Sequence, residues 1–120
     1  RARAYAEAFW PGPLSLLLPK APGLPDALTA GRGEVCVRCP GLDTARALCR
    51  AAGSALTSTS ANRSGQSPAR SLDELDLPGV SIAIDGGTLP PSPPSTVFDP
   101  ETCRILREGV ISEAQLRARL

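Results

Sequence analysis

The chain has 120 residues, which suits one domain or part of one. Its 13 basic and 12 acidic residues give a formal net charge of +1, so it lacks the basic excess of a general polyanion-binding protein, and any anion site must be local. Only 3% of the residues are aromatic, which argues against stacking platforms for bases, and no apolar run approaches the roughly 20 residues that span a bilayer. We therefore predict a cytosolic protein with no membrane partner. Methionine is absent even at position 1, so we expect a further segment upstream.

The first half of the chain predicts two helices and two strands. One helix is expected at residues 2–10, and a second runs to Ala52 from a cap near residue 43 or 44. The strands are expected at residues 14–18 and 33–39. Apolar residues at helical spacing define the first helix, which Pro11 ends, and an apolar run between prolines defines the first strand. Asp43 or Thr44 can cap the second helix, and Gly53 is its C-terminal stop.

The second half of the chain predicts four more strands and a final helix. The strands are expected at residues 55–58, 80–85, 95–99 and 103–107, with a turn near Pro100 between the last two. The alternation of Val80, Ile82 and Ile84 is typical of a half-buried strand. Capping-box spacing predicts a short helical turn at Ser71–Glu74 and a last helix that begins after Ser112. Because helices and strands alternate, we predict an α/β fold with a mixed, twisted sheet and flanking helices.

The cysteines do not form a convincing metal site. Cys36 and Cys39 form a CxxC pair, but Cys49 and Cys103 are isolated and the chain has no histidine. On a strand, an offset of three also places Cys36 and Cys39 on opposite faces. We therefore expect reduced, mostly buried thiols in preference to zinc or redox chemistry.

A polar loop follows the predicted strand at residues 55–58. The segment LTSTSANRSGQSP, Leu56–Pro68, offers donors at Ser58, Ser60 and Asn62, and Gly65 permits close approach of the backbone. Ligands of α/β sheets bind beyond the ends of such strands, so the loop can form a phosphate cradle. It is not a P-loop, because GxxxxGK[ST] is absent, and a serine-rich surface turn is the alternative.

Two arginines lie near strand ends and can reach the same edge of the sheet. Arg38 ends the segment GEVCVR and Arg107 lies in ILREG. A guanidinium is a planar fork that matches a phosphate or a carboxylate. The alternatives are a solvated Arg107, and an Arg38 that pairs with a carboxylate such as Glu34.

Taken together, these motifs resemble those of the YrdC-like family, the threonylcarbamoyl-adenylate synthases. The segments are FWPGPLSLLLP, VCVRCP, LTSTSANRSGQSP, the DGG turn, STVFD and ILREG, in the family's order and rough spacing. The resemblance covers nearly the whole chain, and it implies that residues 1–120 are a partial YrdC-like domain without its N-terminal part. A lysine-x-arginine pair of the family is expected in that upstream part.

The resemblance implies an enzyme that joins L-threonine, bicarbonate and ATP into threonylcarbamoyl-AMP, which serves tRNA modification. It implies Mg²⁺ bound with ATP, and tRNA or double-stranded RNA as a further partner. By similarity, the ATP-binding residues are Ser58, Ser60, Asn62 and Arg107. By similarity, the threonine-binding residues are Arg38 and Ser95. The 120 residues alone are expected to be inactive, because upstream cations are missing.

Two departures from the family pattern leave a second function open. The stretch RCPGLD lacks the histidine that usually follows this element, and Glu34 stands where the family often has a small hydroxyl residue. A carboxylate near the nucleotide can repel phosphate. The alternative is a non-catalytic YrdC-like module that binds a nucleotide or RNA.

Overall fold

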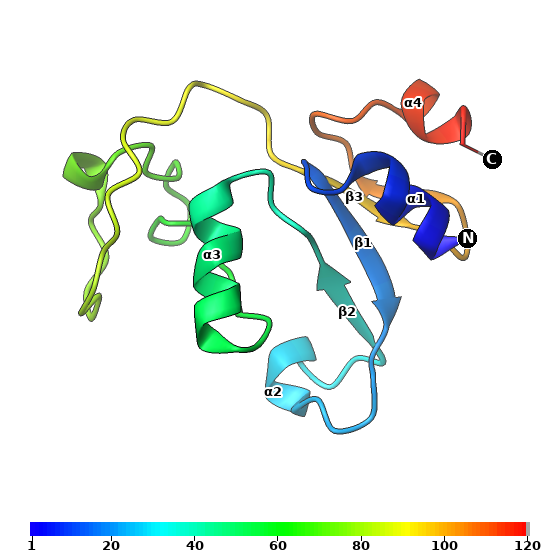
Figure 1. Cartoon of the computed structure of the whole chain (residues 1–120), viewed down its shortest axis with the longest axis horizontal. Helices are drawn as coiled ribbons and strands as arrows, with labels where there is room; N and C mark the ends of the chain where they lie inside the picture. The colour runs from blue at the N-terminus through cyan, green and yellow to red at the C-terminus, as the bar shows by residue number, and fades with distance from the viewer. Residues whose placement is uncertain (120) are drawn as a thin grey trace. The chain divides into compact units, whose positions relative to one another are not determined.

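The computed structural model describes residues 1–119, which divide into two compact units. We call residues 1–54 and 93–119 the sheet unit, and residues 55–92 the loop unit. The sheet unit contains all the strands and α-helices that the structure describes, and the loop unit contains one short 3-10 helix. Figure 1 shows the course of the chain through both units.

The sheet unit is built on four strands in the order β2-β1-β3-β4. The strands are β1 at Leu14–Pro19, β2 at Glu34–Val37, β3 at Thr96–Asp99 and β4 at Arg104–Arg107. β1 runs parallel to β3, while the β1–β2 and β3–β4 pairs are antiparallel. The mixed sheet of an α/β fold is therefore confirmed, and so are the four strands predicted in these regions.

Four α-helices accompany the sheet. They are α1 at Ala2–Phe9, α2 at Asp26–Thr29, α3 at Asp43–Ala52 and α4 at Glu113–Arg117. The capping box predicted for α4 is present, and Gly53 ends α3 with a positive φ of 67°. The predicted side-chain cap of α3 is wrong: Leu42 occupies the N-cap, and the Asp43 side chain instead forms an ion pair with Arg46. The one-turn helix α2 was not predicted, because four residues carry no periodic signal.

The core lies on one face of the sheet, beneath α1 and α4. Alternation along the strands turns Leu14, Leu16 and Phe98 toward this face, and all three are buried. Tyr5 of α1 packs edge-to-face on Phe98 with ring centroids 4.7 Å apart, and Leu116 of α4 joins the same cluster. Short apolar segments thus produce one small core on this face. Polar side chains of the same strands, such as that of Ser15, lie on the opposite face of the sheet.

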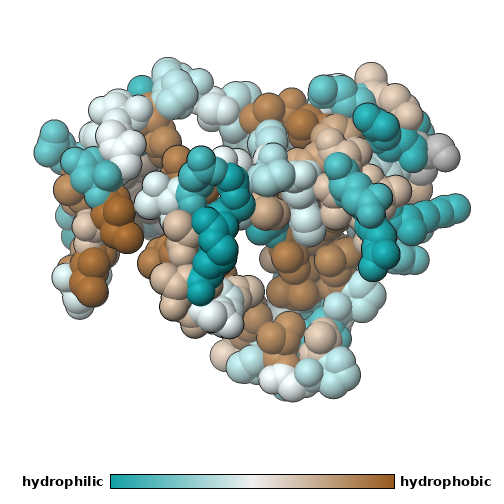
Figure 2. All heavy atoms as spheres, in the orientation of Figure 1, coloured by the Kyte–Doolittle hydropathy of each residue, from teal (hydrophilic) through white to brown (hydrophobic). Residues whose placement is uncertain are grey.

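The loop unit differs from its prediction. Residues 55–58 and 80–85 form no strand, and Ile82 is 84% exposed. Both predictions are wrong for the described chain, because a strand needs a neighbour and no described strand pairs with either segment. Figure 2 shows apolar side chains at the surface over the loop unit. The turn at Leu72–Glu74 is present, without a side-chain capping bond from Ser71.

Backbone and ionic contacts hold the loop unit together. Arg63 binds both carboxylate oxygens of Asp76, at 3.1 and 3.2 Å. Arg70 and Leu89 exchange hydrogen bonds between the two passes of the chain: the Leu89 amide donates to the Arg70 carbonyl, and the Arg70 side chain donates to the Leu89 carbonyl. Irregular backbone is therefore held in place by arginine side chains rather than by a ladder.

Candidate functional site

A row of polar side chains crosses the face of the sheet opposite the core. The hydroxyl oxygens of Ser15 on β1 and Ser95, just before β3, lie 2.9 Å apart. Arg107 at the end of β4 donates from Nη2 to the Ser95 hydroxyl at 3.1 Å and to the Ser95 carbonyl at 2.9 Å. Three strands thus contribute to one cluster of two hydroxyls and a guanidinium, which we call the serine–arginine row.

The alternation of the strands explains why this row forms. Ser15 lies between Leu14 and Leu16, so its side chain leaves the sheet on the side away from the core. It is in register with Val97, and Val97 is in register with Arg107. Ser15 was not singled out from the sequence, although it is the one polar residue in an apolar run.

Cys36 of β2 extends the row on its other side. The residue is exposed overall and its thiol is not in a disulfide. Burial of the sulfur atom raises the pKa of the Cys36 thiol, while a hydrogen bond with Ser15 and the positive charge of Arg107 oppose that rise. The thiol is therefore a neutral neighbour of the row at physiological pH. The expectation of mostly buried thiols is wrong for Cys36, whereas the other three cysteines are half-buried and also free.

Arg38 follows β2 directly and is held by the turn that precedes β1. Its Nε donates to the Gly12 carbonyl at 2.9 Å, and the Gly12 amide donates to the Cys39 carbonyl at 2.9 Å. Gly12 is required here, because a Cβ atom would lie 2.3 Å from the carbonyl oxygen of Phe9. No ion pair with Glu34 occurs among the described residues, so the pairing alternative for Arg38 is wrong.

Arg38 lies beside the serine–arginine row. The register Leu16–Val37 places Arg38 one position beyond the last ladder pair, level with Ser15. Arg107 is exposed, as the alternative of a solvated arginine expects, and it also donates to Ser95. Of the residues proposed from the sequence, the sheet unit brings Ser95 and Arg107 into contact, and it places Arg38 one position after β2, level with Ser15.

Thr96 fixes the backbone on which Ser95 and Arg107 sit. Its side chain is fully buried, and its hydroxyl donates to the Ile111 carbonyl at 2.6 Å. The same oxygen accepts from the amides of Gly109 and Ile111, each at 3.0 Å. A Cβ atom at Gly109 would lie 2.1 Å from the Pro94 carbonyl, so only glycine allows this approach. The Thr of STVFD and the Gly of ILREG belong to the motifs of the family resemblance, but their sequence alone did not indicate this role.

The polar loop lies in the loop unit. Ser58 and Ser60 are exposed, and Asn62 is half-buried. The Asn62 side-chain amide donates to the Arg63 carbonyl at 2.9 Å, and the Asn62 backbone amide donates to the Ser60 carbonyl at 3.0 Å. Within residues 1–119 the buried Oδ1 of Asn62 has no hydrogen-bond partner. Gly65 has a φ of +82°, as a tight polar turn requires.

The donor atoms of the described chain do not build a cage for a metal ion. No group of three or more Asp, Glu, His or Cys side chains converges within residues 1–119. A magnesium ion commonly takes one or two protein carboxylates and completes its shell with water and substrate phosphates. The residues present therefore fit only an ion that arrives with its phosphate ligands.

A family model named Sua5, YciO and YrdC, and described as "Telomere recombination", matches residues 1–109. The chain belongs to this family. The threonylcarbamoyl-AMP synthase of Alkalilimnicola ehrlichii is 41% identical over 107 residues, which cover 89% of this chain and 56% of that protein. The protein of the same name from Idiomarina loihiensis is 39% identical over 104 residues, with 84% and 56% covered. The chain thus spans a little over half the length of these relatives.

The fold of the family is also seen in a solved structure. The crystal structure of P. abyssi Sua5 complexed with L-threonine superposes with a TM-score of 0.91 at 32% identity. The match covers 99% of this chain and 36% of that protein. The resemblance drawn from the sequence motifs is therefore confirmed at the level of family and fold. No helix in the described part of the chain is long and apolar enough to cross a membrane.

Proposed function

We propose that the chain is part of a threonylcarbamoyl-AMP synthase, and that its serine–arginine row binds L-threonine. The observation that carries the proposal is the convergence on the Ser95 hydroxyl of the Ser15 hydroxyl, at 2.9 Å, and the Arg107 guanidinium, at 3.1 Å. Relatives at about 40% identity bear the name of this enzyme, and a family structure holds L-threonine. Both facts support the assignment.

The chemistry of threonine matches this row. Its carboxylate needs a cationic fork, which Arg38 can supply at the edge of the row. Its hydroxyl can exchange hydrogen bonds with Ser95 or Ser15, since a serine hydroxyl both donates and accepts. Cys36 adds a neutral wall, so no negative charge of the row opposes the substrate carboxylate.

We further propose that the polar loop binds the phosphates of ATP. Ser58 and Ser60 offer hydroxyl donors at the surface, and Gly65, with its positive φ, allows close approach of the backbone to an anion. The family resemblance assigns Arg107 to the nucleotide as well, and that assignment stays a prediction. Magnesium would enter with the triphosphate, where it neutralises charge.

In the proposed reaction, the amine of threonine and bicarbonate form a carbamate and release water. A carbamate oxygen then attacks the α-phosphorus of ATP, and the bond to pyrophosphate breaks. The product is threonylcarbamoyl-AMP, which serves tRNA modification in the cytoplasm. The residues named here position and neutralise anions, which is how such transfers are mainly accelerated.

Calorimetry on the complete protein tests this function. L-Threonine and ATP should each bind, and Ser60→Ala/Asn62→Ala should weaken ATP by about 1 to 3 kcal/mol, roughly five- to over a hundred-fold, with threonine affected less. A matched control is Ser54→Ala, which removes an exposed hydroxyl outside the polar loop. Wild-type ATP affinity in the double variant would remove the loop from the site. Binding of both substrates without formation of threonylcarbamoyl-AMP would favour the non-catalytic module.

A further inference from the structure

Ser15 is the buried member of the serine–arginine row. It is 6% exposed, whereas Ser95 is half-buried and Arg107 is exposed. The hydroxyl oxygens of Ser15 and Ser95 lie 2.9 Å apart. A substrate that arrives from solvent therefore meets Ser95 rather than Ser15. What remains for Ser15 is an effect that Ser95 transmits.

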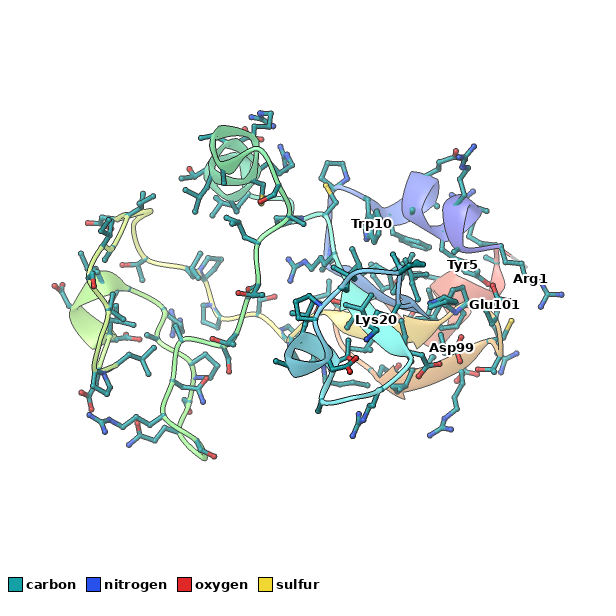
Figure 3. The ribbon with its side chains drawn as sticks, turned by 90° about the horizontal axis from the view of Figure 1, so that it is seen from below. Arg1, Tyr5, Trp10, Lys20, Asp99 and Glu101 are labelled. Carbon is teal, nitrogen blue, oxygen red and sulfur yellow. The ribbon has the colours of Figure 1, made fainter. Side chains whose placement is uncertain are left out.

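The backbone on both sides of Ser15 is held in place. The indole Nε1 of Trp10 donates to the Leu14 carbonyl at 2.7 Å, and Figure 3 shows Trp10 at the junction of α1 and the sheet. The Thr96 amide donates to the Pro13 carbonyl at 3.0 Å. The Ser15 hydroxyl thus starts from a fixed point of β1, which suits a group that orients another side chain.

The single proton of the Ser95 hydroxyl can point in one of two directions. A hydroxyl has one proton and two lone pairs, and a guanidinium only donates, so Arg107 occupies one lone pair of Ser95 at 3.1 Å. If Ser15 donates to the second lone pair, the proton of Ser95 is left for a ligand. If Ser95 donates to Ser15 instead, it offers a ligand only a lone pair.

Cys36, the other polar neighbour of the Ser15 hydroxyl, favours the first arrangement. Burial raises the pKa of the Cys36 thiol, and a hydrogen bond with Ser15 opposes that rise. The thiol is therefore protonated at neutral pH, and a protonated sulfur is a weak acceptor. The Ser95 oxygen is the better acceptor for the one proton that Ser15 has to give.

We propose that Ser15 is a positioning residue, which donates to Ser95 and so directs the Ser95 proton onto the side-chain hydroxyl of the substrate. This inference rests on the proposed L-threonine site and adds a basis for its selectivity. An amino acid of similar shape without the hydroxyl, such as L-2-aminobutyrate, would leave the Ser95 proton without an acceptor. A site built to pair a substrate hydroxyl rejects the analogue that lacks it.

Calorimetry with L-threonine and L-2-aminobutyrate on the complete protein tests the inference. The wild type should prefer L-threonine, and Ser15→Ala should reduce that preference about two- to tenfold, because L-threonine binds more weakly while L-2-aminobutyrate changes little. Ser15→Cys, which keeps the volume but has only a weak donor, should behave as the alanine variant does. Ser15→Thr keeps the hydroxyl, suits a strand and should retain the preference. The matched control is Ser54→Ala, at an exposed serine outside the row, which should bind both amino acids as the wild type does.

A double-mutant cycle shows whether Ser15 acts through Ser95. Ser95→Ala should itself lower the preference, and Ser15→Ala/Ser95→Ala should lower it no further. Additive effects would mean that Ser15 contacts the substrate directly, and equal weakening of both amino acids would mean a merely structural role. Either result overturns the inference alone, as does a wild-type preference in both Ser15→Ala and Ser15→Cys. A wild type that does not bind L-threonine overturns the proposed function together with the inference.

Discussion

Replacing Thr96 by valine tests whether its buried hydroxyl holds the backbone that carries Ser95 and Arg107. The substitution leaves the side chains proposed to bind the substrates unchanged. Valine has nearly the shape of threonine, so the core stays filled while the hydroxyl is lost. The carbonyl and amide of Ile111, a buried residue, lose their partner, and so does the amide of Gly109. Each buried group left unpaired costs about 1 to 3 kcal/mol, and the two groups of Ile111 alone give a loss of about 2 to 6 kcal/mol.

Urea unfolding of Thr96→Val and wild type measures this loss as a difference in the free energy of unfolding. In thermal unfolding, the melting temperature of a domain of this size should fall by about 10 °C or more. Thr44→Val is the control, because Thr44 is an exposed residue of α3 and its change should cost only a few tenths of a kcal/mol. Thr96→Ser keeps the hydroxyl and should lie between the two. If Thr96→Val were within about 0.5 kcal/mol of Thr44→Val, the hydroxyl would not hold this loop.

Two further predictions concern the proposed threonine site. In calorimetry, Arg38→Lys should weaken the binding of L-threonine by about 1.5 to 3 kcal/mol and the binding of ATP far less, since a point charge replaces a planar fork. The control Arg50→Lys, at an exposed residue of α3, should change neither affinity. Equal affinity for L-threonine in the two variants would remove Arg38 from the site. Because burial raises the pKa of Cys36, iodoacetamide should alkylate this thiol more slowly than free cysteine at neutral pH, and faster as the pH rises. L-Threonine should slow the reaction, and a rate that ignores the amino acid would place Cys36 away from the substrate.

The sheet unit was largely predictable because its signals are local. The apolar run between prolines at LSLLL, the glycine after Ala52 and the capping box at Ser112 each depend on a few neighbouring residues. The site could not be predicted from local signals, because Ser15 and Ser95 are 80 residues apart and meet only through the parallel pairing of β1 with β3. A single sequence does not reveal that pairing, so Ser15 was missed.

In the loop unit, a local pattern predicts a strand that the structure does not contain. Val80, Ile82 and Ile84 alternate as in a strand. Alternation only shows that the segment would suit a pleated, half-buried surface, and a strand also needs a neighbouring strand to pair with. Among the described residues no strand offers the ladder, and all three side chains are exposed. The backbone is held instead by side chains such as Arg70, which binds the Leu89 carbonyl.

The two faces of the sheet follow from the same alternation and carry different chemistry. Ser15 points away from the core because Leu14 and Leu16 point into it, so the residues that stabilise the sheet also aim the serine–arginine row. On the core face, Tyr5 uses its ring for packing on Phe98, and its hydroxyl is buried without a hydrogen-bond partner in residues 1–119. Alternation therefore separates the packing side chains of the core face from the polar side chains proposed to bind the substrate.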